Sequence, residues 1–292
     1  MAESARTATA GASQVPRGRS IRSLAWRNRL VRVGGAIIAV EVVVAALSSF
    51  IVPYSPIEIV GGPLLPPGSP GHLLGTDEIG RDLLSRVVAG APVSLVEGLV
   101  VVAIAMSLAI PLGLIAVEVP RLDGPIMRVM DSLLAFPGML LALAFVAVLG
   151  PSLPSVLFAV GLSSVAPAVV LVRATARAAA SEDYVLAARS LGASRLRVAT
   201  RHVLPNILAP LLVSSTFRIA TALLVTTGLS FLGMGAQPPA PEWGSMLAGG
   251  RDLLYVAPWV TTFPGLAILF TVFGFNLLGD GLRDVLDPRL QV

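Results

Sequence analysis

The stretch Glu182–Asn206, with the sequence EDYVLAARSLGASRLRVATRHVLPN, is a charged segment between long apolar runs. Six arginines fall between Arg173 and Arg201, and that density of charge is too costly to place in lipid. The whole chain is 55% hydrophobic and 13% charged, whereas soluble domains carry about 25% charged residues. The composition therefore predicts an all-α integral membrane protein that exposes one polar docking segment.

Six apolar stretches are long enough to cross a bilayer, since about 20 helical residues span its hydrocarbon core. The predicted spans cover residues 33–52, 93–117, 133–150, 154–173, 207–230 and 258–279. A Gly-Pro turn at 150–154 separates the third span from the fourth, which favours a helical hairpin. The first span is interpreted as an uncleaved helix, because the polar region before it is longer than that of a signal peptide.

The distribution of arginine predicts the orientation, because cytoplasmic loops are rich in basic residues. With the N-terminus inside, 17 arginines lie on the cytoplasmic side and only Arg81, Arg86 and Arg251 lie outside. Both termini are therefore expected in the cytoplasm. Residues 1–32 form a basic cytoplasmic tail whose first 20 residues are expected to be disordered, and residues 33–292 form the membrane domain.

The spans leave two outer loops, 53–92 and about 231–257, and one long cytoplasmic loop, 174–206. The first outer loop carries GTDEIGRDLLSR, from Gly75 to Arg86, and the second contains GAQPPAPEWGSMLAGGRD. These outer loops can contact a soluble component outside the cell, or they can simply cap the spans; the residues alone leave both interpretations open.

Several kinds of site are excluded by composition. All 21 basic residues are arginine, so a Walker A phosphate loop, which needs lysine, is absent and the chain is not expected to hydrolyse ATP itself. With no cysteine and only His72 and His202, thiolate and Cys/His metal sites are excluded, and no cofactor is expected in this chain. The arginines cluster in a few loops, which indicates membrane topology rather than a nucleic-acid site.

The 182–206 loop is predicted to form two short helices that meet at Gly192. Ser181 is a suitable N-cap for the first helix, and Ser194 for the second. Gly192 breaks the helical run between them, and Pro205 is expected to end or kink the second helix.

One side of the first helix is predicted to be apolar. Val185, Ala188 and Leu191 have the spacing of a helical stripe, and the small Ala187 and Gly192 allow another backbone to approach. Arginines surround this stripe, which suits a short helix that docks in a cleft of another protein. The alternative is a helix that lies on anionic lipid headgroups.

The same loop resembles the EAA loop of ABC-importer membrane subunits, with its pattern E-A-A, three residues, Gly, about nine residues and H-x-L-P. The matching residues are Ala187, Ala188, Gly192, His202, Leu204 and Pro205. Leu186 stands where that family usually has glutamate. Four further blocks resemble the C-type permease subunit of dipeptide, oligopeptide and nickel importers. They are GTDEIGRDLLSR (75–86), LSFLGMG (229–235), PEWGSML (241–247) and FNLLGDGLRDVLDPR (275–289).

The resemblance implies a type I ABC importer permease fold in a bacterial plasma (inner) membrane. The expected partners are a second homologous permease, two ATP-binding cassette subunits that hold ATP and Mg²⁺, and an extracytoplasmic binding protein. The expected substrates are di- or oligopeptides, with nickel or another small solute as the alternative.

The resemblance also assigns roles within the loop. Ala187, Ala188 and Gly192 are expected to contact an ATPase subunit, and His202 and Pro205 to set the exit angle into the fifth span. The neighbouring Leu186 and Arg189 are expected on the same docking surface. A glutamate at position 186 can pair with an arginine, whereas leucine cannot, so this surface is expected to depend more on apolar contact.

Charges inside spans are costly and are functional candidates by default. Glu41 in the first span and Arg218 in the fifth are expected at similar depth. They can pair with each other, or Arg218 can face the pathway and attract a peptide carboxylate, or it can contact the partner permease. Glu97 and Glu118 lie near span ends and are expected to snorkel or cap.

Two other classes of function remain as alternatives. A stand-alone secondary transporter explains six spans but not the two-helix polar loop, and no strong internal repeat is evident. A membrane enzyme needs a close catalytic constellation that the residues do not provide.

Overall fold

The computed structural model describes residues 28–286. Residues 1–27 and 287–292 lie outside it, and with them the predicted disorder of the first 20 residues and the end of the 275–289 block. Within the described residues the chain is helical, and two isolated bridges, Ser69–His72 and Thr76–Asp82, are the only strand-like pairing. The predicted all-α class is therefore confirmed for this part of the chain.

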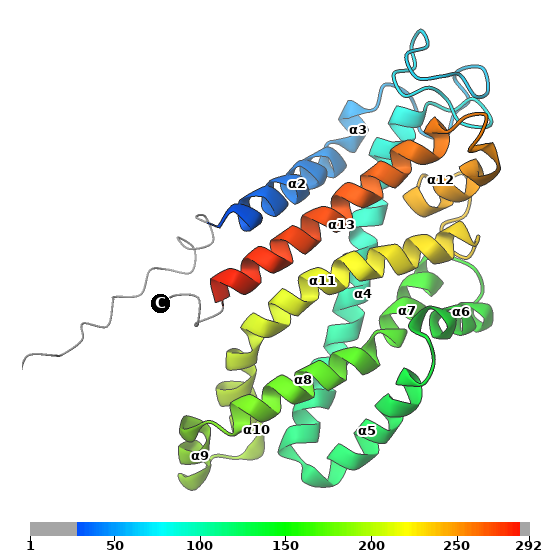
Figure 1. The fold of residues 1–292 in the computed structure, drawn as a ribbon. Coiled ribbons are helices and arrows are strands. Elements are labelled where there is room, and N and C mark those ends of the chain that lie inside the picture. Colours follow the sequence, from blue (N-terminus) through cyan, green and yellow to red (C-terminus); the bar gives the residue numbers. More distant parts are fainter. Residues whose placement is uncertain (1–27, 287–292) are drawn as a thin grey trace, which may run out of the picture.

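The helices form an elongated bundle (Figure 1). In chain order they are α2 (Arg29–Ala46), α3 (Ser48–Ile51), α4 (Leu83–Glu118), α5 (Pro120–Leu134), α6 (Gly138–Leu149), α7 (Leu153–Ser163), α8 (Val165–Ala180), α9 (Asp183–Ser190), α10 (Arg195–Arg197), η1 (Val198–Val203), α11 (Leu204–Phe231), α12 (Trp243–Gly250), η2 (Arg251–Leu253) and α13 (Trp259–Leu286). Helix α13 packs against both α2 and α11, and α4 packs against α8 and α11. The loop before α4 and helix α12 lie at one end of the bundle, and α9 and α10 lie at the other.

Four helices are long and apolar enough to span a membrane: Leu83–Glu118, Leu153–Ala180, Arg195–Phe231 and Trp259–Leu286. A fifth span arises if α5 and α6, which meet at a bend of 90°, cross together. Helix α2 is not among them, because its 18 residues include two arginines and Glu41. The structure thus supports four or five of the six predicted spans.

Helix α4 begins at Leu83, ten residues before the predicted start of the second span. Asp82 caps it by accepting a hydrogen bond from the Ser85 backbone N–H at 2.8 Å. The first turn, Leu-Leu-Ser-Arg, is part of the helix, which therefore begins before the long apolar run. Its 36 residues correspond to about 54 Å, which exceeds the hydrocarbon core.

The third predicted span, 133–150, is not one straight helix. Helix α5 ends at Leu134 and α6 begins at Gly138, immediately after Pro137. Proline disfavours the helical conformation of the residue before it, so the chain bends at this point. Helix α6 has only 12 residues and is too short to cross alone. The predicted turn between the third and fourth spans is confirmed, because α6 ends at Leu149, Gly150 is its C-cap, and α6 packs against α7.

The other predicted spans differ from the helices mainly at their ends. The fourth extends to Ala180, and the fifth lies within Leu204–Phe231. The sixth, predicted to start at residue 258, starts at Trp259 and continues to Leu286. Helices α2 and α13 approach closely at Gly34, where an added Cβ would lie 2.6 Å from the Leu278 backbone nitrogen. This contact fixes the first helix against the last.

Candidate functional site

The 182–206 loop consists of two short helices that meet at a glycine, as predicted. Gly192 lies between α9 and α10 with φ +83°, a conformation that L side chains rarely adopt. Ser194 caps α10 by accepting a hydrogen bond from the backbone N–H three residues later, also as predicted. Ser181 does not cap α9: it closes α8, and the following residue takes the N-cap position of α9.

The apolar residues of the loop do not form a single stripe. Val185 is fully buried in the main hydrophobic core, and Ala188 is half-buried. Leu191 is instead 89% exposed, because it lies beyond the last turn of α9, at the glycine turn, where helical periodicity no longer applies. The predicted stripe through these three residues is therefore wrong: Val185 anchors α9 and Leu191 faces outward.

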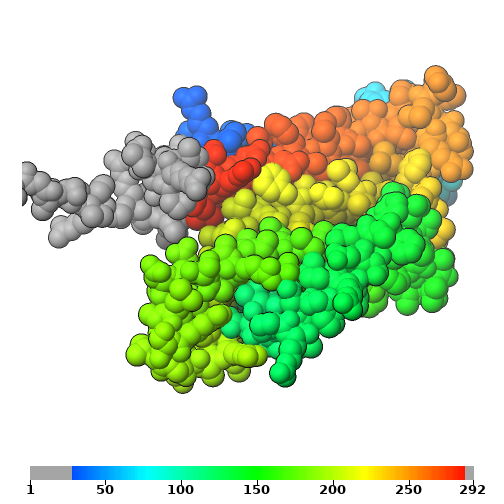
Figure 2. All heavy atoms as spheres, turned by 60° about the horizontal axis from the view of Figure 1, so that its bottom comes forward, coloured from blue at the N-terminus to red at the C-terminus, as the bar shows by residue number. Residues whose placement is uncertain are grey.

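An exposed apolar surface does exist on the loop. Leu186, Leu191 and Leu196 are 48%, 89% and 75% exposed, and the small residues Ala187 and Gly192 are exposed between them. Figure 2 shows the loop, in yellow-green, projecting at the end of the molecule beside α5. Exposed large apolar side chains on a short polar loop are typical of a contact with another protein.

Pro205 was expected to end or kink the second helix, and the first of these two outcomes does not occur. The residues before it form the π-helical turn η1, and α11 continues through Pro205 in its first turn. Proline has no N–H to donate and crowds the carbonyl four residues earlier, and a wider turn accommodates both. The result is one helix of 37 residues, Arg195–Phe231, that joins the loop directly to the membrane.

His202 lies in this turn and contributes its backbone. Its carbonyl oxygen accepts hydrogen bonds from Tyr184 Oη at 3.3 Å and from Asn206 Nδ2 at 2.6 Å. The first of these bonds connects α9 to η1, so the two arms of the loop are linked away from the glycine turn.

Arg189 is engaged within the chain. Its guanidinium lies 2.9 Å from Glu118 Oε1 at the end of α4, and Glu118 is 8% exposed. The expectation that Glu118 snorkels or caps its own helix is therefore wrong. Glu118 instead anchors the loop to α4. A cavity of about 300 Å³ between the loop and this corner is lined by both residues.

Three of the six arginines in this region are paired and three are not. Asp123 of α5 accepts hydrogen bonds from Arg173 and from Arg177 of α8, the latter at 2.9 Å. With Arg189, these two are the three paired arginines. No described residue forms an ion pair with the other three, which are Arg195, Arg197 and Arg201. They remain exposed around the leucines.

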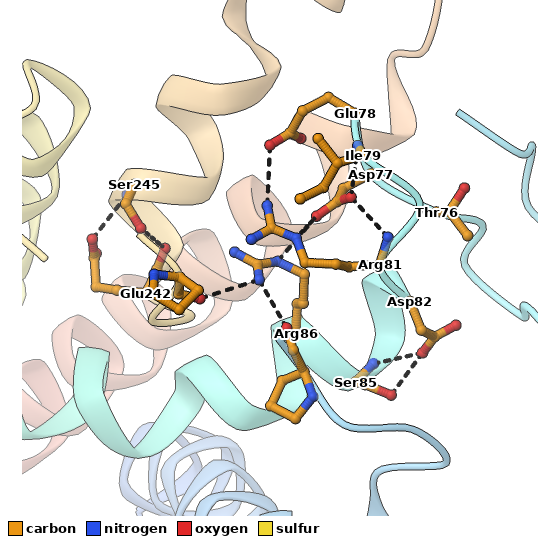
Figure 3. A network of polar contacts seen from close by, with 12 residues as sticks. Thr76, Asp77, Glu78, Ile79, Arg81, Asp82, Ser85, Arg86, Glu242 and Ser245 are labelled. Carbon is orange, nitrogen blue, oxygen red and sulfur yellow. Dashed lines mark hydrogen bonds and ion pairs between the residues drawn. The ribbon is translucent and has the colours of Figure 1, made fainter. Parts of the chain in front are cut away.

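The opposite end of the bundle holds a buried network of charges (Figure 3). Arg81 Nε lies 2.6 Å from Asp77 Oδ2, and its guanidinium also contacts Glu78 at 3.1 Å. Arg86 lies 3.3 Å from the same Asp77 oxygen and donates to the carbonyls of Pro56 and Pro239. Arg86 thereby joins the two outer loops.

This network gives a structural role to most of the charged residues in the Gly75–Arg86 motif. The side chains of Asp77, Arg81 and Arg86 are almost completely buried, and His72 Nδ1 lies 2.9 Å from Asp82 Oδ1. Most of these charges serve internal contacts, which fits the interpretation of this motif as a cap of the bundle. The signal available in the sequence was its balance of acidic and basic residues.

The burial of two carboxylates was not predicted from the sequence. Glu97 is fully buried rather than snorkelling, and its Oε2 accepts a hydrogen bond from Thr226 Oγ1 at 2.7 Å. Glu242 is also fully buried and caps α12 by accepting a hydrogen bond from the Ser245 backbone N–H at 2.8 Å. Burial raises the pKa of Glu242 above its ordinary value. Only an N-cap pattern, Glu242 before Trp243-Gly244, could have indicated this position.

Arg218 and Glu41 do not pair. Arg218 Nε donates to Ser214 Oγ at 3.2 Å, and its Nη2 donates to the Pro167 carbonyl at 3.0 Å. Glu41 lies against Thr271 of α13. Arg218 lines a cavity of about 340 Å³ between α4, α6, α7, α8 and α11. Of the three interpretations, the ion pair is therefore wrong, and the position of Arg218 at a cavity is compatible with the second, in which it faces the pathway.

The comparisons with known proteins agree with this arrangement. Residues 109–292 match the family described as binding-protein-dependent transport system inner membrane component. The chain belongs to this family. It is the membrane permease subunit of an ABC importer, in the inner membrane of a bacterium.

The relatives of the permease are similar over nearly their whole length. A putative peptide transport system permease protein of Brucella suis is 47% identical over 267 residues, which is 91% of this chain and 90% of the relative. The di/tripeptide transport system permease protein DppC of Pseudomonas aeruginosa is 47% identical over 266 residues, 88% of each chain. The dipeptide transport system permease protein DppC of Escherichia coli is 45% identical over 272 residues, 91% of each chain.

Proposed function

We propose that this permease forms half of the translocation pathway of an ATP-driven peptide importer. Relatives at 45–47% identity are named for peptide, dipeptide or di/tripeptide transport, which supports peptide as the substrate class. A second, homologous permease forms the other half, two ATPase subunits bind the cytoplasmic side, and a binding protein delivers the peptide outside. ATP and Mg²⁺ are held by the ATPase subunits, since this chain has no lysine for a Walker A loop.

The observation that carries the coupling role is the continuous helix Arg195–Phe231. A push on the exposed leucines of the 182–206 loop moves a rigid rod whose far part crosses the membrane. Because α11 carries Arg218 at the cavity, the same movement reaches the proposed pathway. A flexible linker at Pro205 would have absorbed this displacement.

A second route runs through α4. The Arg189–Glu118 ion pair joins α9 to the end of α4, and the Tyr184–His202 hydrogen bond keeps α9 and η1 together. The loop therefore moves as one piece against two long helices. Within this proposal Leu186, Ala187, Ala188 and Gly192 meet the ATPase subunit, and the unpaired arginines lie around that contact.

Six spans with both termini in the cytoplasm complete the proposal. Helices α2 and α3 together supply the first span, and the bent α5–α6 pair supplies the third. The 17-to-3 distribution of arginine then puts the 182–206 loop inside and the charge network of Figure 3 outside.

Reconstitution tests the function directly. The chain, a homologous permease and both ATPase subunits are purified as a complex, placed in proteoliposomes and supplied with binding protein and a radiolabelled dipeptide. We expect uptake only when ATP is present on the side of the ATPase subunits. Peptide uptake by the chain alone without ATP would indicate a secondary transporter, and ATP-driven uptake of nickel but not of peptide would indicate a different solute.

A further inference from the structure

The cavity beside Arg218 has an unusual lining for the middle of a membrane protein. It holds about 340 Å³, which falls at the lower end of the roughly 300–1,000 Å³ typical of ligand pockets. Apolar residues such as Val101, Val160 and Val225 form most of the wall, and Arg218 is its one charged residue. Arg218 lies midway along α11, which runs from Leu204 to Phe231, so it is far from either membrane surface.

The guanidinium is held in place but is not neutralised. Two of its five N–H groups are used, by Ser214 Oγ and the Pro167 carbonyl, which are both uncharged. No carboxylate among residues 28–286 forms an ion pair with Arg218. The two neutral contacts fix the direction of the side chain and leave further donors free for an anionic ligand.

The hydroxyl groups of the cavity complement this cation. Ser163 and Ser164 both donate to the Val160 carbonyl, and Thr221 donates to the Phe217 carbonyl. Each hydroxyl group donates its proton to a backbone carbonyl three or four residues earlier in the chain. The lone pairs of its oxygen can therefore accept a hydrogen bond from an N–H group of a ligand. The wall therefore offers one strong anion site, several acceptors and apolar surface.

We propose that Arg218 binds the C-terminal carboxylate of the peptide during its passage, with the hydroxyls of Ser163, Ser164 and Thr221 accepting from peptide N–H groups. This subsite rests on the proposed function of peptide import. A guanidinium donates paired N–H bonds to a carboxylate in forked geometry and repels the peptide's ammonium end, so it orients the peptide as well as selecting it. Two of the five N–H groups are already occupied, so three remain for the peptide's carboxylate.

The test compares two probes in the assembled complex: alanyl-alanine and its C-terminal amide. Both are supplied at concentrations that saturate the binding protein, checked by its own fluorescence titration. Transport of each probe is measured for wild type, Arg218→Gln and Arg218→Lys. The ratio of variant to wild type is compared between probes, so the binding protein's own preference cancels. Arg32→Gln, the same change on the exposed side of α2, is the matched control.

We expect Arg218→Gln to slow the free acid about tenfold more than the amide, Arg218→Lys to keep most of the preference, and Arg32→Gln to leave both rates unchanged. Equal slowing of both probes by Arg218→Gln, or no slowing, would overturn the proposal. The first of these outcomes would indicate that the charge serves folding or a carboxylate of the partner permease.

A second variant keeps Arg218 and so does not depend on the assembly of Arg218→Gln. Thr221→Asp puts a carboxylate three residues along the same helix, within reach of the guanidinium. We expect it to slow the free acid more than the amide, since it occupies the site of the peptide's carboxylate. If wild type transports neither probe, the proposed function itself fails; if wild type transports the acid and every variant treats both probes alike, only the subsite fails.

Discussion

Leu186 is the residue at which this chain departs most clearly from the EAA pattern. Its side chain is 48% exposed on α9, next to the exposed Ala187. The nearby Arg189 is already paired with Glu118. A leucine at this position adds to the apolar area of the docking surface, together with Leu191 and Leu196.

Leu186→Glu tests whether the docking surface is apolar. In the assembled complex we expect transport-coupled ATPase activity to fall by about tenfold, because burying a carboxylate against an apolar cleft without a partner costs more than 1.4 kcal/mol. Leu186→Met, which keeps an apolar side chain of similar volume, should retain the activity. If the glutamate variant matched wild type, the idea of an apolar contact at this position would fail.

Arg218 and Glu41 show what a sequence can say about a single charge. A charge in mid-span costs on the order of 2.5–3.5 kcal/mol, so the sequence marks both residues as functional candidates. It does not determine their partners, because similar depth is only one coordinate of their positions. Helix α2 packs on α13, while Arg218 lies on α11 facing α8, so equal depth does not bring the two together.

At the scale of elements, the position of the two outer loops depends on Arg86. Its side chain is 6% exposed and connects the first turns of α4 to both outer loops through Asp77, Pro56 and Pro239. The second outer loop also packs through the buried Trp243, and the buried network adds the polar contacts that hold the two loops together.

Arg86→Ala should lower the free energy of unfolding of the purified permease by at least about 2 kcal/mol, because it leaves buried carbonyls and part of Asp77 unsatisfied. The measurement is the thermal unfolding midpoint in detergent. The matched change Arg251→Ala, at the same end of the molecule, removes only an exposed pair with Asp252 at 3.5 Å and should cost less than about 1 kcal/mol. Equal shifts for the two variants would contradict a structural role for the network.

Hydropathy located the helices better than it located their ends. The apolar runs marked α4, α11 and α13, but α4 begins before its long apolar run, at a turn that Asp82 caps, and α11 continues through Pro205. Both differences arise from backbone hydrogen bonding, which depends on caps and turn geometry rather than on apolarity. The break between α5 and α6 has the same origin, since Pro137 acts on the backbone of its neighbour.

At the scale of the whole molecule, the orientation can be tested because the chain has no cysteine. Tyr255→Cys puts a thiol at a fully exposed position between η2 and α13, and Leu191→Cys puts one at the tip of the 182–206 loop. We expect a membrane-impermeant maleimide to label Tyr255→Cys in cells whose outer envelope layers have been removed and whose inner membrane is intact. Leu191→Cys should react only after the membrane is permeabilised. Labelling of Leu191→Cys in intact membranes would reverse the proposed topology.

Membrane residence, the helical class and the family followed from the sequence, because these depend on how much apolar surface each stretch has and on a run of local residues such as Ala187 to Pro205. The absence of lysine likewise excluded a Walker A phosphate loop from this chain. Contacts between distant segments were decided only by the tertiary structure. Folding paired Arg189 with Glu118, used the charges of Gly75–Arg86 internally, and separated Arg218 from Glu41. Which side chains meet depends on how helices rotate and pack around one another, and linear spacing carries no information on that angle between different helices.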